Sequence, residues 1–138
     1  MNNLPYVEVS FIIEGKFDVQ KFSEEIGISP SETRGINDWP DVIKKNTSLP
    51  KELQPRCVWC ISQKAERCNK IEIPINKIIF QLISKEQKII EFCNKNNLIS
   101  SLCITIYGEA MNLPEIVLSS KIVSYFGELN SEISFDLC

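Results

Sequence analysis

The chain has 138 residues, of which 43% are hydrophobic and 24% charged, and its formal net charge is −3. This length suits one domain around one hydrophobic core, and the composition excludes long disordered stretches. We therefore expect a single domain over residues 1–138. The chain contains no histidine. That absence excludes Ser-His and Cys-His nucleophiles and removes the commonest zinc ligand.

The N-terminal residues lack the basic start and apolar run of a secretory signal, and no apolar run is long enough to cross a bilayer. We expect a cytoplasmic protein without membrane contact, whose six cysteines stay reduced. The net charge is −5 over residues 1–43, +6 over 44–97 and −4 over 98–138. This pattern fits either a dipolar surface suited to a protein partner or a set of solvated faces.

The first predicted elements are a strand and a helix. Apolar and polar residues alternate over Tyr6–Glu14, which predicts a strand with one face in the core. Asp18 suits the N-cap of a helix, and Phe17 and Phe22 stand where a hydrophobic staple forms. Gly27 is placed to end that helix in a left-handed turn.

Residues 28–56 show no sustained period and contain four prolines. A loop of this length in a compact domain is usually functional or partly disordered, so it is the first place to look for a site. Within it, Ile36 and Trp39 are candidates to hold the loop against the core. Asp41–Lys45 is expected to form one helical turn.

The middle of the chain predicts a strand followed by helices. Arg56–Gln63 is rich in β-branched and aromatic residues, which indicates a buried strand, and Ile71–Ile73 is expected to add a short extended piece. After Pro74 the apolar residues follow helical spacing. Ser84 and Gln87 form a capping-box pattern inside this stretch, so we expect two helices or a kink there.

The C-terminal part repeats the plan of the N-terminal part. Leu102–Tyr107 alternates as a strand, Ser119 suits an N-cap, Gly127 is expected to stop the helix, and Ile133–Leu137 alternates as the last strand. The residues expected to be buried on one sheet face are Val7, Val9, Phe11, Ile13, Leu102, Ile104, Ile106, Ile133, Phe135 and Leu137.

The predicted order is β-α-β-α-α-β-α-β. Both ends read strand, glycine, loop, helix, glycine, which suggests pseudo-repeated β-α units of a ferredoxin-like character. We predict an α+β fold: a two-layer sandwich with a mainly antiparallel sheet and helices on one face.

Several of these segments together resemble a known family. They are Val9–Gly15, Gly27–Pro30, Thr33–Gly35, the strand with Trp59, and the stretch from Val117–Ser119 to Ile133–Asp136. In these the chain is similar to the bacterial family known as domain of unknown function 4279, over nearly its whole length. The resemblance implies a fold but no catalytic residues. Some members are thought to be immunity proteins of bacterial toxin systems, which implies a binding role.

Cys57 and Cys60 form a Cys-x-x-Cys pattern, with Cys68 eight residues further on. A zinc or redox site would need a turn that brings both sulfurs together. Residues three apart on a strand point to opposite faces, which favours buried and inert cysteines. We therefore predict no metal site and no cofactor, and keep a thiol- or metal-dependent enzyme using Cys57 and Cys60 as the alternative function.

Arg34, Trp39 and Arg56 are the candidate binding residues, because tryptophan and arginine dominate the energetics of protein-protein interfaces. They could instead be a loop plug and two surface charges. Acidic pairs at Glu24–Glu25 and at Asp38 with Asp41 could act as acid and base, although such pairs are usually solvated. Nucleic-acid binding is disfavoured by the acidic balance of the chain.

We therefore expect a non-catalytic cytoplasmic binding protein, immunity-like in role, with a protein partner that contacts the loop from Ser29 to Arg56. No catalytic residues are assigned.

Overall fold

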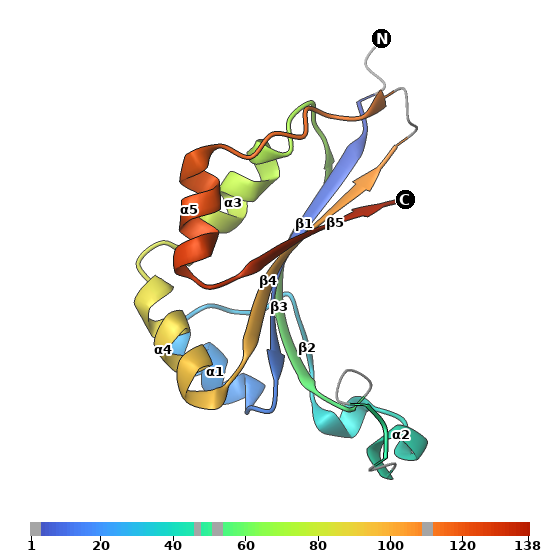
Figure 1. Cartoon of the computed structure of the whole chain (residues 1–138), viewed down its shortest axis with the longest axis vertical. Coiled ribbons are helices and arrows are strands. Elements are labelled where there is room, and N and C mark those ends of the chain that lie inside the picture. The colour runs from blue at the N-terminus through green and yellow to red at the C-terminus, as the bar shows by residue number, and fades with distance from the viewer. Residues whose placement is uncertain (1–3, 46–47, 51–53, 109–111) are drawn as a thin grey trace.

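The computed structural model describes residues 4–45, 48–50, 54–108 and 112–138. The chain is an α+β fold in which helices cover one face of a five-stranded sheet (Figure 1). The strands are β1 (Tyr6–Gly15), β2 (Glu32–Arg34), β3 (Cys57–Arg67), β4 (Ile99–Tyr107) and β5 (Glu132–Leu137). The helices are α1 (Val19–Ile26), α2 (Asp41–Lys45), α3 (Glu72–Leu82), α4 (Glu86–Asn96) and α5 (Ser120–Glu128).

The strand order is β2-β3-β1-β4-β5, with β1 antiparallel to both neighbours, β2 antiparallel to β3, and β5 parallel to β4. The predicted two-layer sandwich with a mainly antiparallel sheet is therefore confirmed. Helices α1, α3, α4 and α5 form the layer on one face of the sheet, and α2 lies apart from them, beyond the ends of β2 and β3 (Figure 1). The face opposite that layer is here called the open face.

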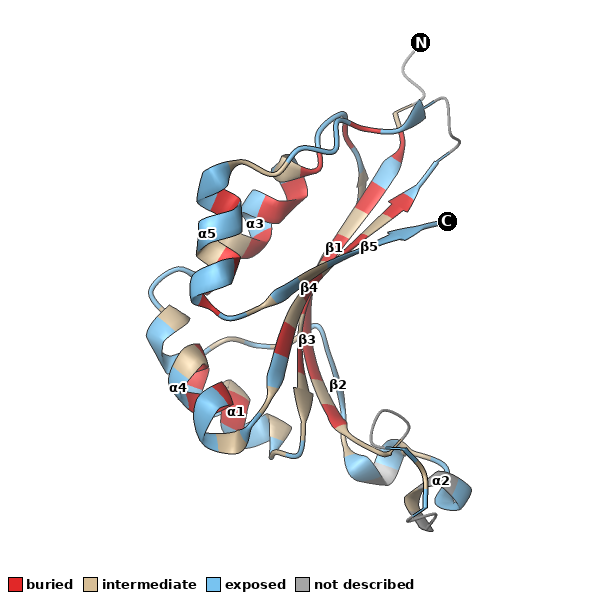
Figure 2. Ribbon diagram, in the orientation of Figure 1, coloured by how far each residue is buried: buried red, intermediate tan, exposed pale blue. Residues whose placement is uncertain are grey.

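The core lies between the sheet and the helices. All four alternating residues of β1 that were predicted to be buried are fully buried, as are their neighbours on β4 (Figure 2). Phe22 of α1 packs edge-to-face on Trp59 of β3 with ring centroids 4.8 Å apart. Because the side chains of a strand alternate, one face of each central strand supplies the core and the other forms the open face.

The first helix forms as predicted. The Asp18 carboxylate accepts hydrogen bonds from the backbone N–H groups of Gln20 and Lys21, which have no partner within the helix. Phe17 and Phe22 contact each other at a centroid distance of 5.7 Å. Gly27 ends the helix in the left-handed region with φ of 79°.

The expected extended piece at Ile71–Ile73 is wrong, because α3 begins at Glu72. Pro74 is tolerated in the first turn of a helix, where its missing N–H would have no partner. The break between α3 and α4 is confirmed, but its mechanism differs from the prediction. The Ser84 hydroxyl donates to the carbonyl of Ile83 instead of capping α4, and Ser84 itself takes a positive φ of 66°.

Ser119 caps α5 as predicted, accepting from the N–H of Ile122. The prediction that Gly127 stops this helix is wrong, because α5 continues to Glu128. The left-handed residue is Asn130, with φ of 57°, and the N–H of Ser131 then bonds the carbonyl of Phe126 at 2.9 Å. Asparagine is one of the few residues that adopts this conformation readily.

The predicted burial of β5 is wrong for two of its three apolar residues. Phe135 is 44% exposed and Leu137 is 66% exposed, while Ile133 is partly buried against the core. These side chains stand on the helix-covered side of the sheet, level with buried residues of β4. The reason for the exposure is position: β5 is an edge strand, and the helix layer does not cover its C-terminal half.

Residues 28–56 are more ordered than the expected irregular loop, although 46–47 and 51–53 lie outside the described residues. The segment forms β2, a short 3-10 helix (Ile36–Asp38) and the predicted turn α2. Ile36 is 38% exposed and does not enter the core. Within the described residues, no helix is long and apolar enough to cross a membrane.

Candidate functional site

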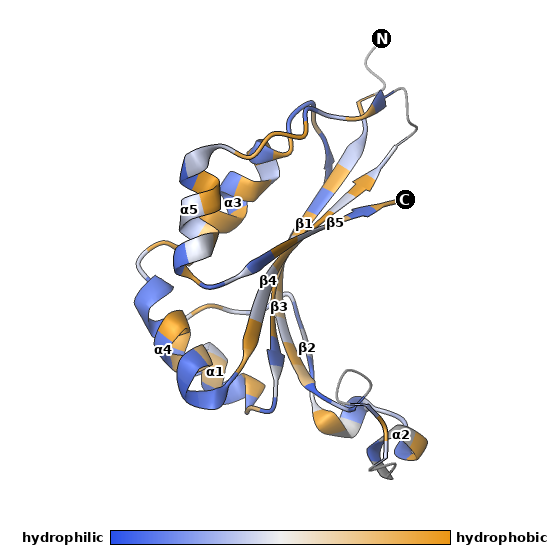
Figure 3. Ribbon diagram, in the orientation of Figure 1, coloured by the Kyte–Doolittle hydropathy of each residue, from blue (hydrophilic) through white to orange (hydrophobic). Residues whose placement is uncertain are grey.

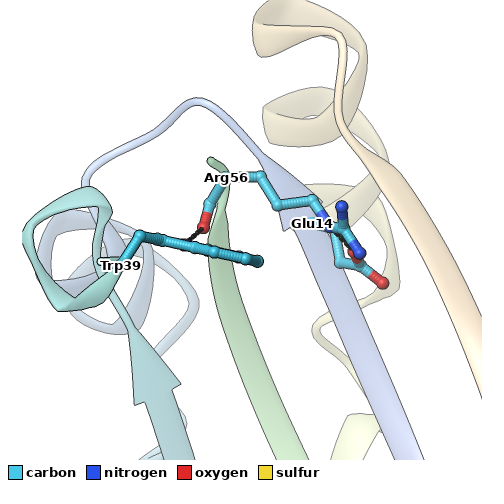
Figure 4. Close-up of polar contacts among 3 residues, drawn as sticks. All are labelled: Glu14, Trp39 and Arg56. Carbon is cyan, nitrogen blue, oxygen red and sulfur yellow. Dashed lines mark hydrogen bonds and ion pairs between the residues drawn. The ribbon is translucent and has the colours of Figure 1, made fainter. Parts of the chain in front are cut away.

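The structure brings together the three residues that were singled out as binding candidates. The Arg34 guanidinium lies over the Trp39 ring at 4.3 Å from its centroid, and that of Arg56 lies 5.9 Å from the same centroid. The indole Nε1 of Trp39 donates a 2.7 Å hydrogen bond to the backbone carbonyl of Arg56 (Figure 4). We call Arg34, Trp39, Arg56 and Glu14, the ion-pair partner of Arg56, the Trp39 cluster.

The four members of the Trp39 cluster come from four separate segments of the chain. Arg34 is on β2, whose residues pair with Cys60, Trp59 and Val58 of β3. Trp39 directly follows the 3-10 helix, whose start is fixed by a 2.7 Å hydrogen bond from the Gly35 N–H to the Asp38 carboxylate. Because β2 pairs with β3, the segment that follows β2 lies close to Arg56, the residue that precedes β3.

Glu14 was not predicted as part of a site. It stands on the polar side of β1, and the pairing of Glu14 with Val58 places it near the start of β3, where Arg56 forms an ion pair with it. The two residues are 42 positions apart. Only the register between β1 and β3 brings them together, and no local pattern carries that information.

An open depression of about 980 Å³ adjoins the cluster at the same end of the sheet. Its lining includes both partners of the Glu14–Arg56 ion pair, and the other lining residues are Gly15, Lys16, Gln54, Pro55, Asn96, Asn97, Ile99 and Glu132. Ile99 is 62% exposed, so the depression combines charged groups with an accessible apolar side chain. This combination suits recognition of a protein surface, in which apolar contact is bordered by polar groups.

The acidic pairs take structural roles or lie in solvent. Asp38 closes the turn before Trp39, and Asp41 forms a 3.1 Å ion pair with Lys44. Glu24 and Glu25 are exposed on α1. Glu25 lines a second depression, of about 580 Å³, between α1 and α4, where lysines and acidic residues are mixed.

The two cysteines of the Cys-x-x-Cys pattern lie on opposite faces of β3. Cys57 shares the face of the core residue Trp59, whereas Cys60 is on the open face beside Ser62, 3.3 Å from its hydroxyl. Burial raises the pKa of the Cys60 thiol, although hydrogen bonds with Ser62 and Ser10 oppose this. A raised pKa reduces the thiolate population and hence nucleophilicity. Among the described residues, no three cysteine, aspartate or glutamate side chains are grouped to hold a metal ion.

Comparisons with known proteins bear on the family and leave the activity open. No curated protein and no solved structure matches the chain significantly. The family model described as a domain of unknown function (DUF4279) matches residues 5–138, which is nearly the whole chain and includes every member of the Trp39 cluster. The chain therefore belongs to the DUF4279 family.

Proposed function

We propose that this chain is a non-catalytic cytoplasmic binding protein, immunity-like in a bacterial toxin system, which binds its protein partner through the Trp39 cluster. The observation that carries the proposal is the packing of two guanidinium groups against one partly buried tryptophan beside an open depression. Tryptophan and arginine held by neighbouring groups are the residue types that supply most of the binding energy at protein interfaces.

The charges of the cluster indicate the chemistry of the partner. Glu14 pairs with Arg56, while Arg34 is exposed and forms none of the ion pairs among the described residues. A guanidinium stacked on an aromatic ring keeps its N–H donors free at the edge for a carboxylate. We therefore expect the partner to present an acidic side chain to Arg34 and an apolar group to Trp39 and Ile99.

The alternative, an enzyme that uses Cys57 and Cys60, receives less support. Its two sulfurs would have to act together, and strand geometry directs them to opposite faces of β3. The burial that raises the pKa of Cys60 also opposes its use as a nucleophile.

The experiment is a binding titration with purified partner, identified by co-purification with the tagged wild-type chain. Trp39→Ala and Arg34→Gln should each weaken binding by about thirtyfold, the effect of removing a residue worth about 2 kcal/mol. The matched control is the Arg67–Tyr6 pair, in which a guanidinium lies 4.4 Å from an aromatic centroid near the other end of β1. Arg67→Gln and Tyr6→Ala should change the affinity less than about threefold, as peripheral contacts do.

Wild-type affinity in a folded Trp39→Ala, Arg34→Gln double variant would refute the assigned site. The immunity-like role has a separate test, in which a neighbouring gene whose product arrests growth when expressed alone is co-expressed with this chain. The wild-type chain should restore growth and the double variant should not. Growth arrest that persists with the wild-type chain would refute the role.

A further inference from the structure

The two edges of the sheet differ in their protection. β2 has three residues, all exposed, of which Glu32 and Arg34 are charged, and short charged edges resist pairing with other chains. β5 has six residues without proline, lysine or arginine, and it forms the opposite edge. Figure 2 shows β5 mostly in the exposed colour, next to the alternately buried β4.

The hydrogen bonds between β5 and β4 show which backbone groups of β5 point away from β4. The N–H of Cys138 donates to the carbonyl of Ile106 at 2.9 Å, and the carbonyl of Cys138 accepts from Gly108. The backbone N–H and C=O groups of successive residues in a strand point to opposite edges. Those of Asp136 and Ser134 therefore also point toward β4. The outward N–H and C=O groups are therefore those of Ile133, Phe135 and Leu137.

The same three residues carry the apolar side chains of β5. In the register between β5 and β4 they lie beside Leu102, Ile104 and Ile106, which are at most 1% exposed. Phe135 and Leu137 are 44% and 66% exposed. Figure 3 shows the hydrophobic colour of the sheet reaching this outer strand. The buried apolar residues of the core therefore continue onto an edge strand whose outward hydrogen-bonding groups have no partner strand among the residues that the structure describes.

We propose that β5 pairs with β5 of a second copy of this chain, antiparallel about a two-fold axis at Phe135, so that two sheets join into one. In this register Phe135 faces Phe135, Ile133 faces Leu137, and Ser134 faces Asp136. The interface is self-complementary, as a two-fold requires. Paired apolar residues cover each other on the core side, and the outward backbone groups hydrogen-bond across the axis.

The charge pattern of β5 selects this register over its neighbours. If one β5 strand is shifted by two residues along the other in one direction, Glu132 lies opposite Asp136. If it is shifted by two residues in the other direction, Asp136 lies opposite Asp136. Like charges directly opposite each other destabilise a strand pair. The pairing goes beyond the proposed function, since Arg34 of the Trp39 cluster is on β2 at the opposite edge of the sheet. The depression beside the cluster reaches β5 only at its first residue, Glu132, which lies outside the paired residues Ile133–Leu137.

The test is the oligomeric state of the full chain, measured by light scattering coupled to size-exclusion chromatography over a series of concentrations. The wild-type chain should have the mass of two chains, and Phe135→Glu and Phe135→Lys should each be monomeric because like charges meet on the axis. A mixture of the two variants should recover the mass of two chains. Phe80→Lys, which changes a 79% exposed residue of α3, should remain dimeric.

Amide hydrogen exchange gives a second readout that also shows whether Phe135→Glu is folded. In the wild-type dimer the amides of Phe135 and Leu137 should be protected, and in the variant they should exchange freely. The amides of Ser134 and Asp136 should stay protected in both, because they face β4. A monomeric wild-type chain at every concentration, or a dimer that survives Phe135→Glu, would overturn the proposal.

Discussion

The indole Nε1 of Trp59 donates a 2.9 Å hydrogen bond to the hydroxyl of Ser23, and this bond joins β3 to α1 inside the core. Trp59 is fully buried. The Ser23 hydroxyl in turn donates to the carbonyl of Val19 at 3.1 Å. A small polar group on the inner side of α1 therefore satisfies the one polar atom that the largest core side chain carries.

Replacing Ser23 with alanine should lower the free energy of unfolding by about 1–3 kcal/mol, because the buried indole N–H would lose its partner. Urea unfolding monitored by tryptophan fluorescence measures the change. Ser124→Ala, at an exposed position of α5, is the matched control and should be neutral or slightly stabilising. Equal effects at the two positions would show that the hydrogen bond contributes nothing.

Replacing glycine with alanine should have opposite effects on stability at Gly15 and Gly127. Gly15 has φ of +149°, and an added Cβ would lie 2.5 Å from a methyl carbon of Leu98. Gly127 lies within α5 with nothing within 4 Å of such a Cβ. We expect Gly15→Ala to destabilise by more than about 1 kcal/mol and Gly127→Ala to stabilise by about 0.5–1 kcal/mol. Thermal unfolding midpoints that move in the same direction would contradict this.

Regular alternation was sufficient to predict β1 and β4, whose inward residues are all buried. The same pattern in β5 placed Phe135 on the correct side of the sheet but could not show whether anything covers that side. Alternation reports the direction of a side chain, and burial depends on helices that come from elsewhere in the chain. The three polar residues of β2 carry no periodic signal, because their pairing with β3 is a tertiary contact.

The candidate site was predictable in its residue types and not in its contacts. Arginine and tryptophan in a long loop indicated a binding surface, and the structure places all three candidates together. Glu14 and Ile99 could not be found, since each is an ordinary strand residue until β1, β3 and β4 are aligned.

The two tryptophans should differ in their contribution to stability. Trp59 is fully buried among aromatic rings, whereas Trp39 is partly exposed and packs on arginine side chains outside the core. Trp59→Ala should cost about 3–5 kcal/mol of unfolding free energy. Trp39→Ala should cost about 1.5 kcal/mol or less, because its main losses are cation-π contacts and one hydrogen bond. A comparable loss at Trp39, measured by urea unfolding, would assign that side chain a structural role instead of a binding one.

The buried thiols should make the fold less stable at high pH. Burial raises the pKa of Cys93 from its ordinary value of 9.0 to about 11. Because the pKa is higher in the folded chain than in the unfolded chain, the folded state holds its proton more tightly. The contribution of Cys93 is complete below pH 9.0 and is lost as the pH rises through 11. The free energy of unfolding should therefore fall over this interval.

Cys93→Ala isolates this effect from the other groups that titrate at high pH. The variant should be less stable than the wild-type chain at neutral pH, because it leaves a small cavity in the core. The difference between the two chains should then shrink as the pH rises toward 11, since only the wild-type chain has a thiol to ionise at this position. Cys138→Ala changes an exposed position and leaves no cavity, so it should match the stability of the wild-type chain at neutral pH. Urea unfolding at closely spaced pH values measures the stability of all three chains. If the difference in unfolding free energy between the wild-type chain and Cys93→Ala stays constant up to pH 11, ionisation of the Cys93 thiol is not coupled to folding.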